Sequence, residues 1–331
     1  MKRWNMAGRM ALLIAGMTLL LTGCGGAFDP KGTNAEEQFF LIALSFFVMA
    51  AVMAVVFGLF FYVLIRFRKK KGQTGYPEQI EGSHKLEVIW TLIPFILIMI
   101  LSVFVVSITF KQDKVANAED AVNVKVVAHQ FWCEFVYSDY SITTAQDLVL
   151  PANSNINVEL TSDDVMHSFW IPQLTGKMDT NPGLKKTLTF DSGEPDVYKG
   201  KCAELCGASH ALMDFKAVVV SEEEFEAWVE KMKAPAPVAA SETTQAGEQL
   251  YQANCIACHA VTTDTPGAGP NLAGFASRET LAGFRENNKE WLKEWISNPQ
   301  EVKPGATMPA FGAAFNDAEL DSLVEYLQTL K

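Results

Sequence analysis

A pair of cysteines followed directly by a histidine stands in the last quarter of the 331-residue chain, as Cys255-Ile256-Ala257-Cys258-His259. Two thiols at this spacing can bond to both vinyl groups of one porphyrin, while the histidine beside them binds the iron. A disulfide or half of a zinc site could use the same cysteines, but no second Cys/His pair follows. The motif therefore predicts haem c held covalently by Cys255 and Cys258, with His259 as an axial iron ligand.

Haem iron usually takes a sixth ligand, which His or Met can supply. No histidine follows His259, and Met308 is the only later methionine in the sequence. Met308 is thus the predicted second axial ligand, and a thioether at this position raises the redox potential of the iron. The alternative is a methionine that only fills the core.

A second group of potential ligands lies at residues 202–213, CAELCGASHALM, where Cys202 and Cys206 precede His210 and Met213. Two thiolates, an imidazole and a thioether favour copper over magnesium or calcium. A disulfide is the usual fate of cysteines outside the cytoplasm, but the His and Met at fixed offsets argue against it. His167, at the end of a β-like run upstream, could join the group.

Two segments that carry no charge, 39–65 and 88–110, precede these motifs. As helices they would be about 40 and about 35 Å long, which is enough to cross the hydrocarbon core of a bilayer, about 30 Å. A basic cluster (Arg66, Arg68, Lys69, Lys70 and Lys71) follows the first segment. The positive-inside rule therefore predicts two membrane spans joined by a cytoplasmic loop, with both termini outside.

The first 23 residues have the basic start, apolar centre and small residues of a secretory signal. The end of this segment, Leu21-Thr22-Gly23-Cys24, resembles a bacterial lipoprotein signal, in which Cys24 would become the lipidated N-terminus. An ordinary signal peptide with an incidental cysteine is the alternative.

After residue 110 the pattern changes to short β-rich runs separated by turn residues, which is typical of a small sandwich or barrel. A helix over 222–232 and an extended linker over 233–246 are expected next, and then helices over 247–254, 289–297 and 317–330, with Asp317 as an N-cap. The predicted division is signal 1–23, N-terminal segment 24–38, span 39–65, cytoplasmic loop 66–87, span 88–110, β domain 111–232, linker 233–246 and haem domain 247–331.

Composition excludes one class of function. The chain has 38 acidic and 27 basic residues, a formal charge of −11. Recognition of a phosphate backbone needs a basic face, so nucleic acid is not an expected partner. Asp163 and Asp164 could attract a basic partner, although charged runs are more often a solvated face.

The order of these features resembles cytochrome c oxidase subunit 2 with a fused mono-haem cytochrome c domain, the haem-c-fused branch of bacterial aerobic oxidases. Residues 269–272 (GPNL), the Met-Pro segment at Met308 and a terminal aromatic helix around Tyr326 follow the order of the cytochrome c family. The resemblance implies a two-helix membrane hairpin, a cupredoxin-like β domain and an all-α haem domain.

The resemblance also implies residue roles at a binuclear copper centre, CuA. Cys202 and Cys206 would bridge the coppers, His167 and Met213 would complete one, and His210 with the Glu204 carbonyl the other. The Glu204 carboxylate would face a magnesium site shared with the catalytic subunit.

Three further positions follow from the resemblance. Glu87, at the start of the second span, would lie at the mouth of a proton channel in the partner subunit. The alternative is an interfacial acid at a helix start, where the helix dipole favours a negative charge. Phe131 and Trp132 would assist electron transfer to copper. Phe131 stands where many members have tryptophan, so the resemblance does not imply that a soluble cytochrome c docks here. Cys133 is expected to be a buried thiol.

The ligand supply limits the function. The chain has six cysteines and five histidines, and an oxygen-reducing centre would need several more imidazoles. The sequence therefore predicts the electron-transfer subunit of a proton-translocating cytochrome c oxidase. Electrons would come from a cytochrome c or a quinol-oxidising complex and pass through haem c and copper to subunit 1, which reduces oxygen to water. The alternatives are the electron-accepting subunit of a nitric oxide reductase and a membrane-tethered electron-carrier lipoprotein.

Overall fold

The computed structural model describes residues 8, 25–69, 72, 74–76, 81–116, 121–265 and 267–331. The signal segment, apart from residue 8, and Cys24 lie outside these described residues. The chain divides into two compact units, one of residues 36–114 and one of residues 1–35 with 115–331. Each unit is considered by itself.

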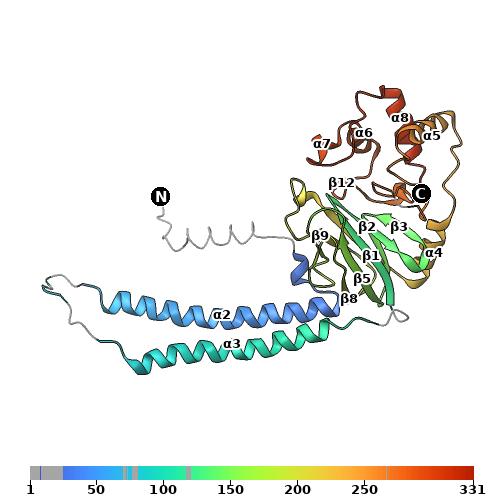
Figure 1. Ribbon diagram of the computed structural model, residues 1–331. Helices are drawn as coiled ribbons and strands as arrows, with labels where there is room; N and C mark the ends of the chain where they lie inside the picture. The colour runs from blue at the N-terminus through green and yellow to red at the C-terminus, as the bar shows by residue number, and fades with distance from the viewer. Residues whose placement is uncertain are drawn as a thin grey trace. The chain divides into compact units, whose positions relative to one another are not determined.

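The smaller unit contains two long apolar helices, α2 (Thr33–Arg66) and α3 (His84–Gln112), which lie side by side (Figure 1). Both have a mean hydropathy of 2.8 over their most apolar window, and none of that window is buried within the protein. Near one end of the pair, Lys111 and Gln112 of α3 contact the carboxylate of Glu37. Both helices are long and apolar enough to cross a membrane, and they fit the two predicted spans.

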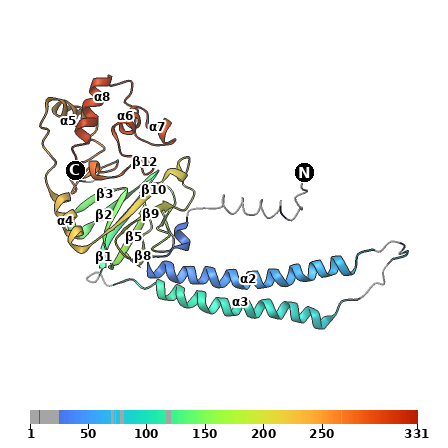
Figure 2. The ribbon, with the colours of Figure 1, turned by 180° about the vertical axis from the view of Figure 1, so that it is seen from behind.

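The β domain is a sandwich of two five-stranded sheets, with strand orders β3-β2-β1-β5-β8 and β4-β10-β9-β6-β7. In the view from behind, β10 lies beside β9 in the second sheet (Figure 2). The strands are β1 (Ala121–His129), β2 (Trp132–Tyr137), β3 (Ile142–Ala145), β4 (Asp147–Pro151), β5 (Asn155–Ser162), β6 (His167–Trp170), β7 (Met178–Thr180), β8 (Lys186–Asp191), β9 (Asp196–Cys202) and β10 (Asp214–Val220). Short 3-10 turns lie at Gly25–Phe28, Ser138–Tyr140 and His210–Leu212.

The core of the sandwich follows from alternating burial along its strands. In β10 every second residue is buried, and the ring of Phe215 contacts those of Phe135 and Phe169 at centroid distances of 5.6 and 5.1 Å. Alternate side chains of each strand point inward, and those of the two facing sheets form one apolar layer. The sandwich closes with α4 (Glu222–Lys233), which begins at a capping box between Ser221 and Glu224.

Helices are the main regular elements of the C-terminal domain, in which the predicted haem motif lies. Its helices are α5 (Glu242–Asn254), α6 (Lys289–Ser297), α7 (Pro299–Val302) and α8 (Asp317–Leu327), with a 3-10 turn at Phe275–Ser277 and a small hairpin of β11 (Thr280–Leu281) and β12 (Arg285–Glu286). Helices α5 and α8 pack together, and the rings of Tyr251 and Tyr326 meet at 5.5 Å.

One helix start and one N-cap differ from the sequence expectation. Helix α5 begins at Glu242, inside the expected linker, because the Ser241 hydroxyl accepts a hydrogen bond from the Thr244 N–H and so forms an N-cap. The N-cap of α8 is Asn316, whose side chain accepts from Glu319 N–H, and Asp317 is the first helical residue. Asn and Asp cap equally well, so the backbone turn decides between these neighbours.

Tyr137 connects the two sheets at an edge. Its hydroxyl donates to the Val149 carbonyl and accepts from the Val149 N–H, both at 2.8 Å, and β4 lies at the end of its sheet. Tyr137 is fully buried, so its hydroxyl pairs backbone groups that have no strand neighbour on that side.

We therefore expect Tyr137→Phe to lower the free energy of unfolding by about 2 kcal/mol, because it leaves a buried N–H and C=O unpaired. Tyr140→Phe removes a hydroxyl from a half-buried ring and is the matched control. Denaturant unfolding of the full chain measures both variants, and an equal, small effect would contradict the role given to the Tyr137 hydroxyl.

Candidate metal and cofactor sites

The cysteine-rich segment lies between β9 and β10 and is folded back on itself. Cys202 ends β9, its N–H donates to the Met213 carbonyl at 3.0 Å, and β10 begins directly after Met213. The next N–H, of Ala203, donates to the Ser168 carbonyl of β6 at 3.0 Å. These bonds hold the segment against β6, and Phe169 pairs with Cys202 in the antiparallel ladder of β6 and β9.

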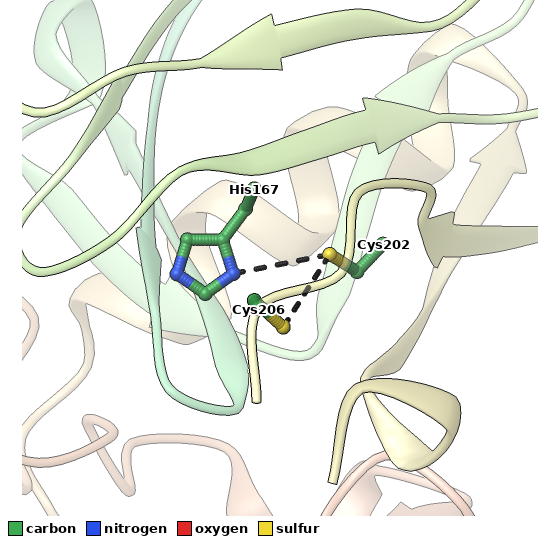
Figure 3. A group of neighbouring side chains, drawn as sticks. All are labelled: His167, Cys202 and Cys206. Atoms are coloured by element: carbon green, nitrogen blue, oxygen red, sulfur yellow. Dashed lines mark hydrogen bonds between the residues drawn. The ribbon is translucent and has the colours of Figure 1, made fainter. Parts of the chain in front are cut away.

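Every side chain predicted at the copper site is brought together here. The sulfurs of Cys202 and Cys206 are 3.8 Å apart without a disulfide, and the Nδ1 atom of His167 is 3.8 Å from the Cys202 sulfur (Figure 3). Around Cys206, the Nδ1 atom of His210 lies at 3.7 Å and the Met213 sulfur at 3.9 Å. These five side chains form one cluster, in which His167, Cys202 and Cys206 are buried and can hold a metal ion.

The backbone of Glu204 belongs to the same cluster. Its carbonyl oxygen lies 3.2 Å from the Cys202 sulfur. The cluster thus offers two thiols, two imidazoles, a thioether and a carbonyl oxygen. Such a soft donor set suits copper.

The charges of the two thiols differ strongly. Burial raises the pKa of Cys202, but hydrogen bonds with His167 and with backbone groups outweigh burial and lower it to about 6. Burial and the neighbouring Cys202 raise the pKa of Cys206 to about 12. The environment thus favours ionisation of Cys202 over Cys206, and metal binding to either thiol displaces its proton.

Asp164 orients the buried imidazole, a role that the sequence did not reveal. Its carboxylate lies 2.7 Å from Nε2 of His167 and accepts from the N–H groups of Gln130 and Val165, both at 2.6 Å. Burial opposes ionisation, but these hydrogen bonds outweigh it and lower the pKa of Asp164. With its proton on Nε2, His167 keeps Nδ1 free to bind a metal. The only signal in the sequence was the spacing of the two residues, three positions apart.

The haem motif follows α5 and lines a cavity of about 390 Å³. His259 and Met308, the two predicted axial ligands, both line this cavity, as do Cys255 and Cys258. Its other walls are mostly apolar and come from α5, α6, α8 and the segment around Met308; they include Tyr251, Leu292, Trp295, Phe311, Leu323 and Leu327. A cavity of this size with apolar walls suits a large planar cofactor.

The imidazole of His259 is held in a defined orientation. Its Nδ1 atom lies 2.8 Å from the Pro270 carbonyl, which leaves Nε2 free to bind iron. A Cβ at residue 269 would lie 2.7 Å from the ring, so the glycine of the GPNL segment makes room for it. Burial lowers the pKa of His259 and thus favours the neutral, ligating form.

The other predicted positions are not members of the cysteine cluster. Glu87 is in the first turn of α3, with its carboxylate 3.7 Å from Nδ1 of His84. Phe131 is 4% exposed, Trp132 stacks on His129 at 4.3 Å, and Cys133 is buried as expected. The roles of Glu87, Phe131 and Trp132 in transfer of protons and electrons stay predictions.

Fold and site together define a class: a membrane-anchored redox protein in which a cupredoxin-like domain with a thiolate–imidazole cluster is followed by a cytochrome c domain. Family models agree with this description along the chain. The model for the transmembrane domain of cytochrome c oxidase subunit II matches residues 28–108, that for its periplasmic domain matches 137–221, and a cytochrome c model matches 244–331.

Relatives of known name match over the full length. Cytochrome c oxidase subunit 2 of Alkalihalophilus pseudofirmus is 42% identical, over 100% of this chain and 99% of the relative. The protein of the same name from Bacillus sp. strain PS3 is 46% identical, over 98% and 97%. A crystal structure of the periplasmic domain of subunit II of cytochrome oxidase from Bradyrhizobium japonicum is 30% identical and covers 35% of this chain and 95% of that domain, with a TM-score of 0.33. The chain belongs to the cytochrome c oxidase subunit 2 family, whose members are components of an oxidoreductase.

The hydrogen bond from His167 gives a prediction. We expect Asp164→Asn to weaken binding of copper to the metal-free chain by about 10- to 100-fold, because the imidazole loses the acceptor that fixes its tautomer. Competition with a chelator measures the dissociation constant.

Asp163→Asn is the matched control, since it makes the same change of charge at the neighbouring residue, whose side chain is 75% exposed. Equal affinities of the two variants would contradict the orienting role of Asp164.

Proposed function

We propose that this chain is the electron-accepting subunit of a terminal cytochrome c oxidase. It takes electrons at the cytochrome c domain and passes them through the cupredoxin-like domain to a haem-bearing subunit 1, which reduces oxygen to water and translocates protons. The convergence of four further donor groups on the pair Cys202 and Cys206 carries this proposal. Bound haem and copper would each supply reversible one-electron oxidation and reduction.

The donor set fits a binuclear copper centre. Cys202 and Cys206, whose sulfurs are 3.8 Å apart, would hold the copper ions together, and the cluster provides further donors beside the pair. In this assignment His167 and Met213 complete one copper, while His210 and the Glu204 carbonyl complete the other. The fold on both sides of the ligands is a packed sandwich, so the ligands move little when the charge changes.

The haem cavity fits a covalently bound haem c. Cys255 and Cys258 hold the porphyrin by thioether bonds, and His259 and Met308 bind the iron from the walls of the cavity. The Pro270 carbonyl fixes the His259 ring, which supports its role as a permanent ligand.

Other subunits complete the reaction. The whole chain has five histidines, of which this assignment uses His167, His210 and His259. A haem–copper oxygen centre needs more imidazoles than remain, so oxygen reduction belongs to the partner subunit. The electron donor is a cytochrome c or a quinol-oxidising complex, and the Glu204 carboxylate contributes to a magnesium site shared with subunit 1.

The membrane topology follows from charge. The basic residues after α2, among them Arg66, Arg68 and Lys69, belong in the cytoplasm of a bacterial cell, so both metal domains lie on the outer side. Lipidation of Cys24 adds an anchor on that same side. Glu87, in the first turn of α3, then lies near the cytoplasmic surface, where it can deliver protons to a channel in the partner subunit.

A comparison of two cysteines tests the proposal. We expect Cys206→Ala to abolish oxygen uptake by the purified oxidase with reduced cytochrome c as donor, while the haem c absorption stays unchanged. Cys133→Ala removes a second buried thiol of the same domain and is the control; it should keep both copper and oxygen uptake.

Full oxygen uptake by Cys206→Ala would overturn the proposed route. Purification of the tagged chain from membranes without a large haem-bearing partner would instead favour a free electron carrier.

A further inference from the structure

The cytochrome c domain contacts the cupredoxin-like domain within one compact unit of the chain. The N–H of Thr143 in β3 donates to the carbonyl of Thr263 at 2.8 Å, and Lys216 of β10 forms an ion pair with Glu279. These groups lie in different domains, so the contact between the domains includes polar interactions. Polar interfaces between domains of one chain commonly allow the domains to move relative to each other unless specific contacts hold them.

Lys303 is an unusual member of this interface. It follows α7 in the cytochrome c domain, and its side chain is 3% exposed. Its ammonium group donates to the carbonyl of Phe131 in the cupredoxin-like domain and to that of Ala282 in its own domain, both at 2.7 Å. A buried ammonium is costly unless it is hydrogen-bonded, so separation of the domains would remove one of its two described acceptors.

The residues after Lys303 continue the contact. The carbonyl of Pro304 accepts a hydrogen bond from the hydroxyl of buried Ser209 at 2.6 Å. Gly305 has a positive φ of 85°, and a Cβ there would lie 3.1 Å from the Phe131 ring. Segment 303–306 therefore packs directly against the cupredoxin-like domain and contacts Phe131.

Both candidate sites meet at this segment. The ring of Phe131 also lies against Gly207, the residue after Cys206, where an added Cβ would be 3.1 Å from it. On the other domain, segment 303–306 leads into Met308, and Phe131 and Lys303 line the same cavity as His259 and Met308. Phe131 thus contacts the copper-ligand segment and the wall of the haem cavity.

We propose that Lys303 is a positioning residue that seats segment 303–306 on Phe131 and thereby sets the contact through which electrons cross from the cytochrome c domain to the cupredoxin-like domain. This inference rests on the proposed function. Bound haem and copper would supply a one-electron exchange in which the haem would be oxidised and the copper pair reduced, with no bond formed or broken. Lys303 itself takes no part in the redox chemistry.

Zero-length carbodiimide cross-linking of the full chain tests the positioning directly and needs no metal. Lys216 and Glu279 report on the domain contact, while Lys201 and Asp214, which pair at 2.8 Å, report on the cupredoxin-like domain alone. We expect Lys303→Met to lower the ratio of the first product to the second by about tenfold, because a buried charged hydrogen bond across the interface is lost. A ratio within about twofold of the unsubstituted chain overturns the inference.

Lys289→Met is the matched control, since Lys289 pairs with Glu325 at an exposed position of the same domain. It should leave the ratio unchanged, and a loss equal to that of Lys303→Met overturns the inference. If Lys303→Met loses the Lys201–Asp214 product as well, the variant is misfolded. In that case the same ratio is measured for Ser209→Ala. That variant removes the hydrogen bond to Pro304 and should lower the ratio about threefold; an unchanged ratio overturns the inference.

Electron transfer in the loaded chain separates this inference from the proposed function. With a photochemical reductant, reduction of the haem should be equally fast in the original chain and in Lys303→Met, whereas transfer to copper within the chain should slow about tenfold in the variant. Equal transfer rates overturn the role of Lys303. Absence of transfer in the original chain would instead overturn the proposed function.

Discussion

The pairing of β6 with β9 is the constraint on which the copper-type cluster depends. It places His167 beside Cys202 although 35 residues separate them, and the turn that follows β9 brings Cys206, His210 and Met213 back to the same place. Because this segment returns directly into β10, its two ends are fixed by strands of one sheet. A rigid donor set of this kind suits electron transfer, in which the ligands should change position as little as possible.

In both candidate sites, packed secondary-structure elements hold the metal-binding side chains in place, although the elements differ. In the cytochrome c domain, helices α5 and α8 pack together through Tyr251 and Tyr326. His259 and Met308, which are far apart in the sequence, both line the cavity in this domain. In both domains a neighbouring oxygen atom holds the key imidazole, the Asp164 carboxylate for His167 and the Pro270 carbonyl for His259. Each ring thereby presents one defined nitrogen to a metal.

Much of this could be predicted from the sequence because the informative residues are local. The haem motif and residues 202–213 carry their chemistry in short spacings, and the membrane helices carry theirs in length and lack of charge. The confirmed architecture follows from these patterns. What the sequence did not reveal depends on distant contacts: Asp164 was interpreted as a solvated charge because its hydrogen bonds form only when two loops meet, and Lys303 contacts Phe131 across 172 positions. The N-cap of α8 was misplaced by one residue because Asn316 and Asp317 are equally good caps.

The central claim is that one chain carries two redox centres, a haem c and a copper pair. A stoichiometric reductive titration of the purified full-length chain, with its metal content measured, tests this most directly. We expect one iron and two coppers per chain and uptake of two electrons, one at the haem absorption band and one at the copper bands. Uptake of a single electron, or fewer than two coppers per chain after full loading, would contradict it.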